Sequence, residues 1–147
     1  MEPLKALREA ISEVLEIMCF LCPVPLKDPP RDLQGRLWEA VEVKFQGESS
    51  GSLRMFFPVG LTEEMTRSLT GDSQQELDRH RVWDALKEVT NMVAGGLLHR
   101  LDPQAGSTLM LPEILPQGTL WEPSQCLAMD LDGEMLLAEL DWKGSAL

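Results

Sequence analysis

One helical segment constrains the fold more than any other part of the sequence. Between residues 76 and 101, apolar residues recur at spacings of three and four. At about 100° per residue they fall within one narrow arc. The members of this stripe are Val82, Leu86, Val89, Val93 and Leu97. The segment is therefore predicted to be a long amphipathic helix, and its apolar stripe must be buried against another layer of structure.

The opposite side of this helix carries a polar ridge formed by Asp84, Glu88, Asn91 and Gly95, which lie within about 60° of one another. Asp84 and Glu88 are like charges one turn apart, and Asn91 is a weak helix former. Gly95 and Gly96 together cost on the order of 1–2 kcal/mol against alanine. Conflicts of this kind indicate a functional surface, whereas the simpler alternative is a solvated outer face.

Three helices are predicted in all. The first begins near Leu4 and ends near Leu21, where Pro23 and Pro25 follow. A short helix begins with Thr62 as its cap and ends before Gly71. The spacing of Ser73 and Glu76 is that of a capping box, which predicts the start of the long helix.

The remaining segments predict β-structure. Residues 41–45 and 53–59 alternate apolar and polar side chains and predict an antiparallel hairpin. A strand is expected at 108–111, followed by a Pro- and Gly-rich connection over 112–123. Residues 127–142 predict a second hairpin that turns at Asp132-Gly133. A two-residue loop there pairs Leu131 with Glu134, Met129 with Leu136, and Leu127 with Ala138.

Taken together, these elements predict an α+β fold, a two-layer sandwich of helices on a mostly antiparallel sheet, in the order α-β-β-α-α-β-β-β. At 147 residues the chain is expected to form a single domain spanning 1–147.

Composition excludes several classes of partner. With 13 basic and 24 acidic side chains the formal net charge is −11, which disfavours nucleic acid and anionic membrane surfaces. No apolar run approaches the ~20 residues of a membrane span, and no signal peptide opens the sequence. We therefore expect a cytoplasmic protein. The odd number of cysteines, 3, does not predict a disulfide framework.

Several motifs allow a chemical and a structural interpretation. Cys19 and Cys22 form a CxxC pair, but they close a helix, where its dipole disfavours a thiolate. Two buried core thiols are therefore expected. The segment 130–134 has part of a calcium loop, but a hairpin turn fits it better. His80 and His99 are isolated, so no cofactor or metal site is expected in this chain.

The segment 84–95, DALKEVTNMVAG, resembles the signature of the CheC/CheX family of chemotaxis phosphatases, an acidic or serine residue followed by ExxN on a long exposed helix. The order of elements is also similar to this CheC-like fold. CheX, with one such motif, is more similar than CheC, with two. The family pattern places a proline at a spacing after Asn91 that lies between those of Pro112 and Pro116. We therefore assign no catalytic residue to the loop between these two prolines.

This resemblance implies a phosphatase that hydrolyses the phospho-aspartate of a CheY-like response-regulator receiver domain in chemotaxis or two-component signalling. Asn91 would position the attacking water and Glu88 would dock a receiver lysine. Asp84 and Gly95 would belong to the partner-binding surface. Mg²⁺ is expected in the receiver partner, and a homodimer is possible. The alternative is a catalytically silent module that binds a receiver domain or a chemotaxis or flagellar component.

Overall fold

The structure of the chain is a computed structural model that describes residues 2–28, 36–71, 76–104, 106–119 and 125–144. Within these ranges lie three helices, α1 (Pro3–Cys19), α2 (Val59–Thr70) and α3 (Arg79–Leu101). The strands are β1 (Val24–Pro25), β2 (Trp38–Gly47), β3 (Ser50–Pro58), β4 (Ser107–Leu109), β5 (Glu113–Ile114), β6 (Cys126–Leu131) and β7 (Glu134–Lys143).

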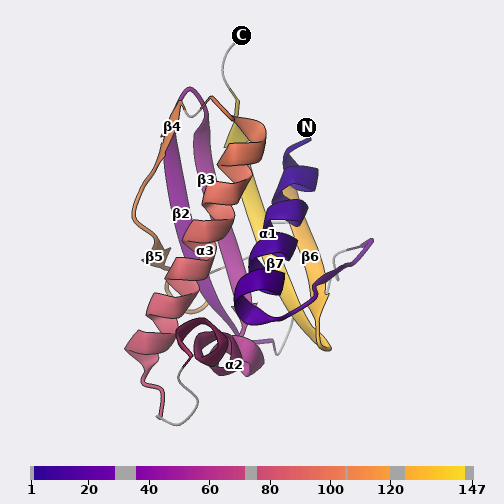
Figure 1. Cartoon of the computed structure of the whole chain (residues 1–147), viewed down its shortest axis with the longest axis vertical. Coiled ribbons are helices and arrows are strands. Elements are labelled where there is room, and N and C mark those ends of the chain that lie inside the picture. Colours follow the sequence, from indigo (N-terminus) through magenta and orange to yellow (C-terminus); the bar gives the residue numbers. More distant parts are fainter. Residues whose placement is uncertain (1, 29–35, 72–75, 105, 120–124, 145–147) are drawn as a thin grey trace.

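All of these strands form one antiparallel sheet in the order β1-β6-β7-β3-β2-β4, and β5 also pairs with β2. α1 and α3 run side by side across one face of the sheet, with α2 at one end of them (Figure 1). The predicted α+β sandwich of helices on an antiparallel sheet is therefore confirmed. None of the described helices is long and apolar enough to cross a membrane.

Two strands were absent from the predicted order. β1 pairs with β6 and β5 pairs with β2, and each has only 2 residues. A segment of two residues cannot display the alternation by which a strand is predicted from sequence. The Pro- and Gly-rich connection after Leu111 consequently contains a short strand, and this strand fixes one end of the loop beside α3.

Both predicted hairpins are confirmed. β2 and β3 pair antiparallel with Val41 opposite Met55. In the second hairpin, β6 and β7 pair in the predicted register, including Met129 opposite Leu136. Asp132 and Gly133 have φ values of 50° and 84°, which is the conformation that a tight primed turn demands. The turn interpretation of this segment therefore holds.

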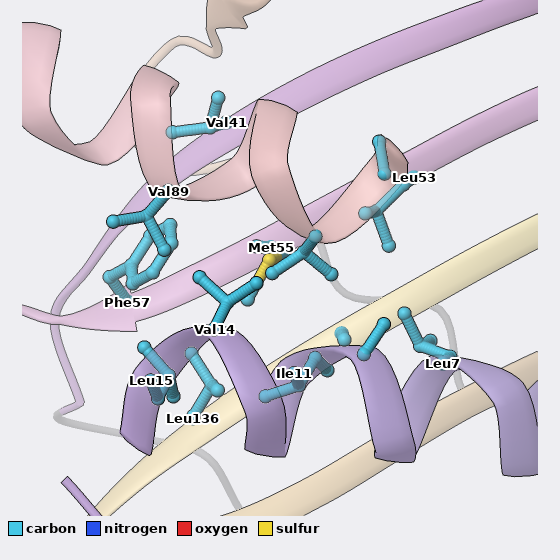
Figure 2. Packing of buried hydrophobic residues seen from close by; sticks show 14 of the residues in the cluster. Leu7, Ile11, Val14, Leu15, Val41, Leu53, Met55, Phe57, Val89 and Leu136 are labelled. Carbon is cyan, nitrogen blue, oxygen red and sulfur yellow. The ribbon is translucent and has the colours of Figure 1, made fainter. Parts of the chain in front are cut away.

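The core lies between the two layers. All five residues of the predicted α3 stripe are buried, the most exposed being Val82 at 8%. Figure 2 shows Ile11 and Val14 of α1 and Val89 of α3 projecting toward β3, the strand that carries Met55 and Phe57. Because the stripe is buried on the sheet, the opposite side of α3 is directed outward.

α3 begins later than the capping-box spacing predicts. Ser73 lies outside the described residues, Glu76 precedes the helix, and the first helical residue is Arg79. Asp78 is the cap, because its carboxylate accepts a hydrogen bond of 2.9 Å from the Arg81 backbone N–H. The prediction placed the start too early because more than one residue in this polar segment has a capping side chain.

The predicted start of α2 at Thr62 is also wrong. The helix begins at Val59, immediately after Pro58, whose backbone is extended. Thr62 lies within the first turn and is buried, and its hydroxyl donates a 3.0 Å hydrogen bond to the Val59 carbonyl. Its side chain therefore pairs with the preceding turn rather than with exposed N–H groups. The predicted end is confirmed, since Gly71 has the left-handed conformation at the C-cap.

α3 is also held against α1 by its last turns. Arg100 forms ion pairs with Glu9 and Glu13 of α1, and one of its guanidinium nitrogens donates to the Gly96 carbonyl at 3.0 Å. A Cβ added at Gly96 would lie 3.2 Å from a nitrogen of this guanidinium and in ordinary contact, at 3.5 Å, with the Ala10 Cβ, so the glycine leaves room for Arg100. Gly96 therefore has a packing role that its neighbour on the ridge lacks.

The division of α3 into a buried and an exposed side predicts that truncations on its two sides change the free energy of unfolding by very different amounts. Leu86→Ala removes a fully buried side chain and should lower the free energy of unfolding by about 2–5 kcal/mol. Asp84→Ala, the control, removes an exposed carboxylate and should change it by no more than about 0.5 kcal/mol. Chemical denaturation measures both, and similar losses in the two variants would contradict the assigned orientation of α3.

Candidate functional site

The four residues of the polar ridge lie together on the outward side of α3, as their spacing predicts. Asp84 and Glu88 are exposed, whereas Asn91 and Gly95 are half-buried. Within the described parts of the chain, the side chains of Asp84, Glu88 and Asn91 make no hydrogen bond or ion pair. Two carboxylates and one amide are therefore available to a partner along two successive turns of one rigid helix.

Asn91 lies at a pocket between α3 and the edge of the sheet. The pocket has a volume of about 580 Å³. Its other lining residues come from β2 and from the stretch between the last residue of β4 and the first residue of β5, and they are Glu42, Lys44, Leu109, Met110, Leu111, Pro112 and Glu113. The amide thus lies beside a recess open to solvent rather than on a flat helix surface.

The loop between Pro112 and Pro116, whose spacing from Asn91 differs from the family pattern, borders the same pocket as Asn91. Pro112 lines the pocket, whereas Pro116 is exposed and is not among its lining residues. Of the two prolines, Pro112 is therefore the one that the structure places with Asn91. Sequence spacing alone did not discriminate between them, because neither matches the family separation.

Gly95 is open to its surroundings. A Cβ added there would approach only the Leu109 Cδ1 atom, at 4.0 Å. The described chain therefore leaves more room at Gly95 than at Gly96. The room above Gly95 is consistent with close approach of another molecule to the ridge.

Gly95 also borders a second pocket, which lies between α1 and α3 and has a volume of about 610 Å³. Its lining is mainly apolar, with charged or polar side chains at Glu13, His99 and Arg100. The ridge therefore separates two recesses, one toward α1 and one toward the β4–β5 segment.

The first turns of α3 are fixed to β2 through Glu39. The Trp83 indole N–H donates to one Glu39 oxygen at 3.2 Å and Arg79 donates to the other at 3.3 Å. The Arg79 guanidinium lies 5.1 Å from the Trp83 ring centroid, a cation–π distance. His80 contacts the same ring edge-on and belongs to this exposed cluster rather than to a catalytic triad.

Sequence analysis did not indicate the residues at the sheet edge that line the pocket together with Asn91. Glu42 is buried and paired with the Arg54 guanidinium at 2.6 Å, with Lys44 further away at 3.8 Å. Alternation along β2 correctly indicated a polar face, but it gave no sign that β5, from elsewhere in the chain, would pair with Glu42.

The CxxC pair lies at the C-terminal end of α1, away from the ridge. Cys19 is buried, and burial raises the pKa of its thiol to about 11, which opposes thiolate formation. Cys22 is exposed and its thiol lies 3.7 Å from a Glu16 carboxylate oxygen. The expectation of two buried core thiols is therefore wrong for Cys22, because the chain leaves the helix after the left-handed Phe20.

No group of three or more His, Cys, Asp or Glu side chains among the described residues is arranged to hold a metal ion. The described part of the site is therefore a surface of carboxylates, one amide and an adjoining pocket. Such a surface is suited to binding another molecule and orienting a group on it.

These features define an α+β protein in which α3 packs on an antiparallel sheet and directs its polar ridge outward. Solved proteins share the fold. CheX from Desulfovibrio desulfuricans superposes with a TM-score of 0.79 at 18% identity, covering 97% of this chain and 100% of that one. CheX from Vibrio vulnificus gives 0.78 at 20% identity, covering 97% of each chain.

A CheX–CheY–BeF₃–Mg²⁺ complex from Borrelia burgdorferi gives a TM-score of 0.71 at 16% identity, covering 97% of this chain and 98% of that one. No curated protein sequence matches the chain. The family model described as chemotaxis phosphatase CheX matches residues 40–125, which is more than half of the chain. The chain belongs to the CheX family.

The different environments of the two cysteines predict different reactivity. At pH 8 a thiol whose pKa is near 11 is only about 0.1% thiolate, so Cys19 should resist a thiol-specific reagent until the protein is unfolded. Cys22 should react in the folded state, and Cys22→Ser should remove that fast phase. Mass spectrometry of the labelled peptides locates the modification. Rapid labelling of Cys19, or a Cys19–Cys22 disulfide in native protein, would contradict this assignment.

Proposed function

We propose that this protein is a phosphatase for the aspartyl phosphate of a receiver domain. The observation that carries the proposal is the Asn91 amide, which is directed outward on α3 without an intramolecular hydrogen bond in the described chain. Membership of the chemotaxis phosphatase CheX family supports a phosphatase or CheY-binding role. The complex of a structurally similar CheX with CheY supports a CheY-like partner.

In the proposed reaction, a water molecule attacks phosphorus in line with the bond to the receiver aspartate. The bond between phosphorus and the carboxylate oxygen breaks, the aspartate leaves as a carboxylate, and both water protons remain with the inorganic phosphate. An amide can both donate and accept a hydrogen bond, so Asn91 can hold the water in this orientation. A glutamine performs the same task in GTP hydrolysis.

Under this proposal the chain orients the attacking water and does not supply a nucleophile of its own. Mg²⁺ held by the receiver neutralises charge on the phosphoryl group, so this chain needs no metal of its own. Glu88 lies one turn before Asn91 and is free to pair with a receiver lysine. Asp84 extends the same surface by another turn, and Gly95 lets the partner approach on the other side of Asn91.

Cellular location and assembly remain part of the proposal. A protein that acts on a receiver domain would work in the cytoplasm, where chemotaxis and other two-component signals are transmitted. The resemblance to CheX also implies a homodimer.

A catalytically silent binding module is the competing function. Such a module would use the acidic residues of the ridge to bind a receiver domain and would not require the Asn91 amide. Truncation of the Asn91 side chain should therefore impair a phosphatase and leave a binding module unaffected.

Asn91→Ala should lower the rate of receiver dephosphorylation by about 10²-fold, because the attacking water loses its orienting hydrogen bonds. The half-buried side chain contributes little to packing, so the melting temperature should change little. Phosphate release from a phosphorylated receiver measures the rate. Gln46→Ala, which removes an exposed amide elsewhere on the protein, is the matched control. Undiminished turnover by folded Asn91→Ala would remove this residue from the mechanism.

Glu88→Lys should weaken receiver binding by about 2 kcal/mol or more, because a lysine would face the receiver lysine with like charge. Titration calorimetry with receivers carrying BeF₃⁻ and Mg²⁺ separates this effect from turnover. Glu64→Lys makes the same charge change at an exposed site on α2 and should bind as the wild type does. If both lysine variants bind equally well, the ridge is not the docking surface.

A further inference from the structure

The pocket beside Asn91 has an exposed apolar rim that the proposed chemistry does not use. Leu111 is 87% exposed and Met110 is 44% exposed, and both line the pocket together with Asn91. Isolated apolar side chains are common on protein surfaces and need no explanation. Here two consecutive ones lie beside the amide to which a partner must bring its phosphoryl group.

The backbone around these two residues is fixed rather than free. The Met110 N–H donates to the Lys44 carbonyl at 2.8 Å, and the Leu115 N–H donates to the Ala40 carbonyl at 2.8 Å. Between them, β5 pairs with residues 41 and 42 of β2. Leu111 is therefore presented from a short segment that is hydrogen-bonded to β2 on both sides.

Pro112 restricts Leu111 further. A residue that precedes proline is confined mainly to extended conformations, and proline fixes its own φ. Little conformational freedom would be lost when Leu111 becomes covered, which lowers the entropic cost of binding. An exposed apolar side chain on a restrained backbone can be covered by a partner at a low cost in backbone entropy.

We propose that Leu111, supported by Met110, is an apolar docking residue for the receiver domain and inserts against an apolar side chain beside the phosphorylated aspartate. This inference rests on the proposed function. An interface of ordinary size covers about 800 Å² of each partner. A receiver whose phosphoryl group reaches Asn91 must therefore also cover the pocket that Leu111 lines.

Attraction between charges would not by itself hold a receiver on the ridge. The ridge carboxylates attract a basic surface, but interactions between exposed charges are screened by salt and act mainly on the rate of association. Apolar burial is much less dependent on salt and slows dissociation. Glu88 would thus guide the receiver to the ridge, and Leu111 would retain it there.

The test compares Leu111→Ser with Leu111→Met and Val24→Ser. Val24 is also an exposed apolar residue, but it lies on β1 at the opposite edge of the sheet from β4. The probes are receiver domains encoded by the same genome as this chain, each carrying BeF₃⁻ and Mg²⁺. Dissociation constants and dissociation rates are measured at low and high salt, and phosphate release is measured with the phosphorylated receivers.

Leu111→Ser should raise the dissociation constant about tenfold at both salt concentrations, mostly through faster dissociation. It should raise KM while leaving kcat near the wild-type value, because Asn91 is intact. Leu111→Met should restore binding, and Val24→Ser should not weaken it.

If Leu111→Ser binds with wild-type affinity, or if Val24→Ser loses as much affinity as Leu111→Ser does, this inference is wrong. The proposed function would still stand as long as the wild-type chain dephosphorylates a receiver. If the wild-type chain neither binds nor dephosphorylates any of these receivers, the proposed function fails and this inference fails with it.

Discussion

Burial of the apolar stripe of α3 on the sheet is the interaction on which the rest of the surface depends. The stripe fixes the rotation of the helix about its axis, since its residues are at most 8% exposed. With that rotation fixed, Glu88 and Asn91 can only be directed outward. The unfavourable choices on the ridge, two like charges and a glycine, are tolerated because the buried side of the same helix provides the stability.

Contacts at both ends of α3 and at the sheet edge complete this surface. Glu39 of β2 holds the first turns through Trp83, and Arg100 holds the last turn against α1. The segment between β4 and β5 then forms a wall beside Asn91 and presents Leu111. A water-positioning amide needs such support, because an orientation error of the order of 1 Å can cost about 10²-fold in rate.

The sequence predicted the parts of the fold that repeat over many residues. The α3 stripe and the register around Asp132-Gly133 were correct because each rests on a long or sharply defined pattern. The predicted start of α3 near Ser73 was wrong because more than one polar side chain there can cap a helix. The predicted start of α2 at Thr62 was wrong because the helix begins after Pro58 without a side-chain cap. β5 was missed because two residues are too few to show the alternation of a strand. The pocket around Asn91 was missed because it is formed by segments distant in sequence.

The most direct test of the account is the decay of a phosphorylated receiver with and without this chain. Receivers from the same genome are phosphorylated with a small phosphodonor in Mg²⁺, and released phosphate is followed over time. The account predicts that a catalytic amount of the chain accelerates release from at least one receiver. Decay at the spontaneous rate for every receiver, with binding still detected, would show a silent binding module and contradict the phosphatase assignment.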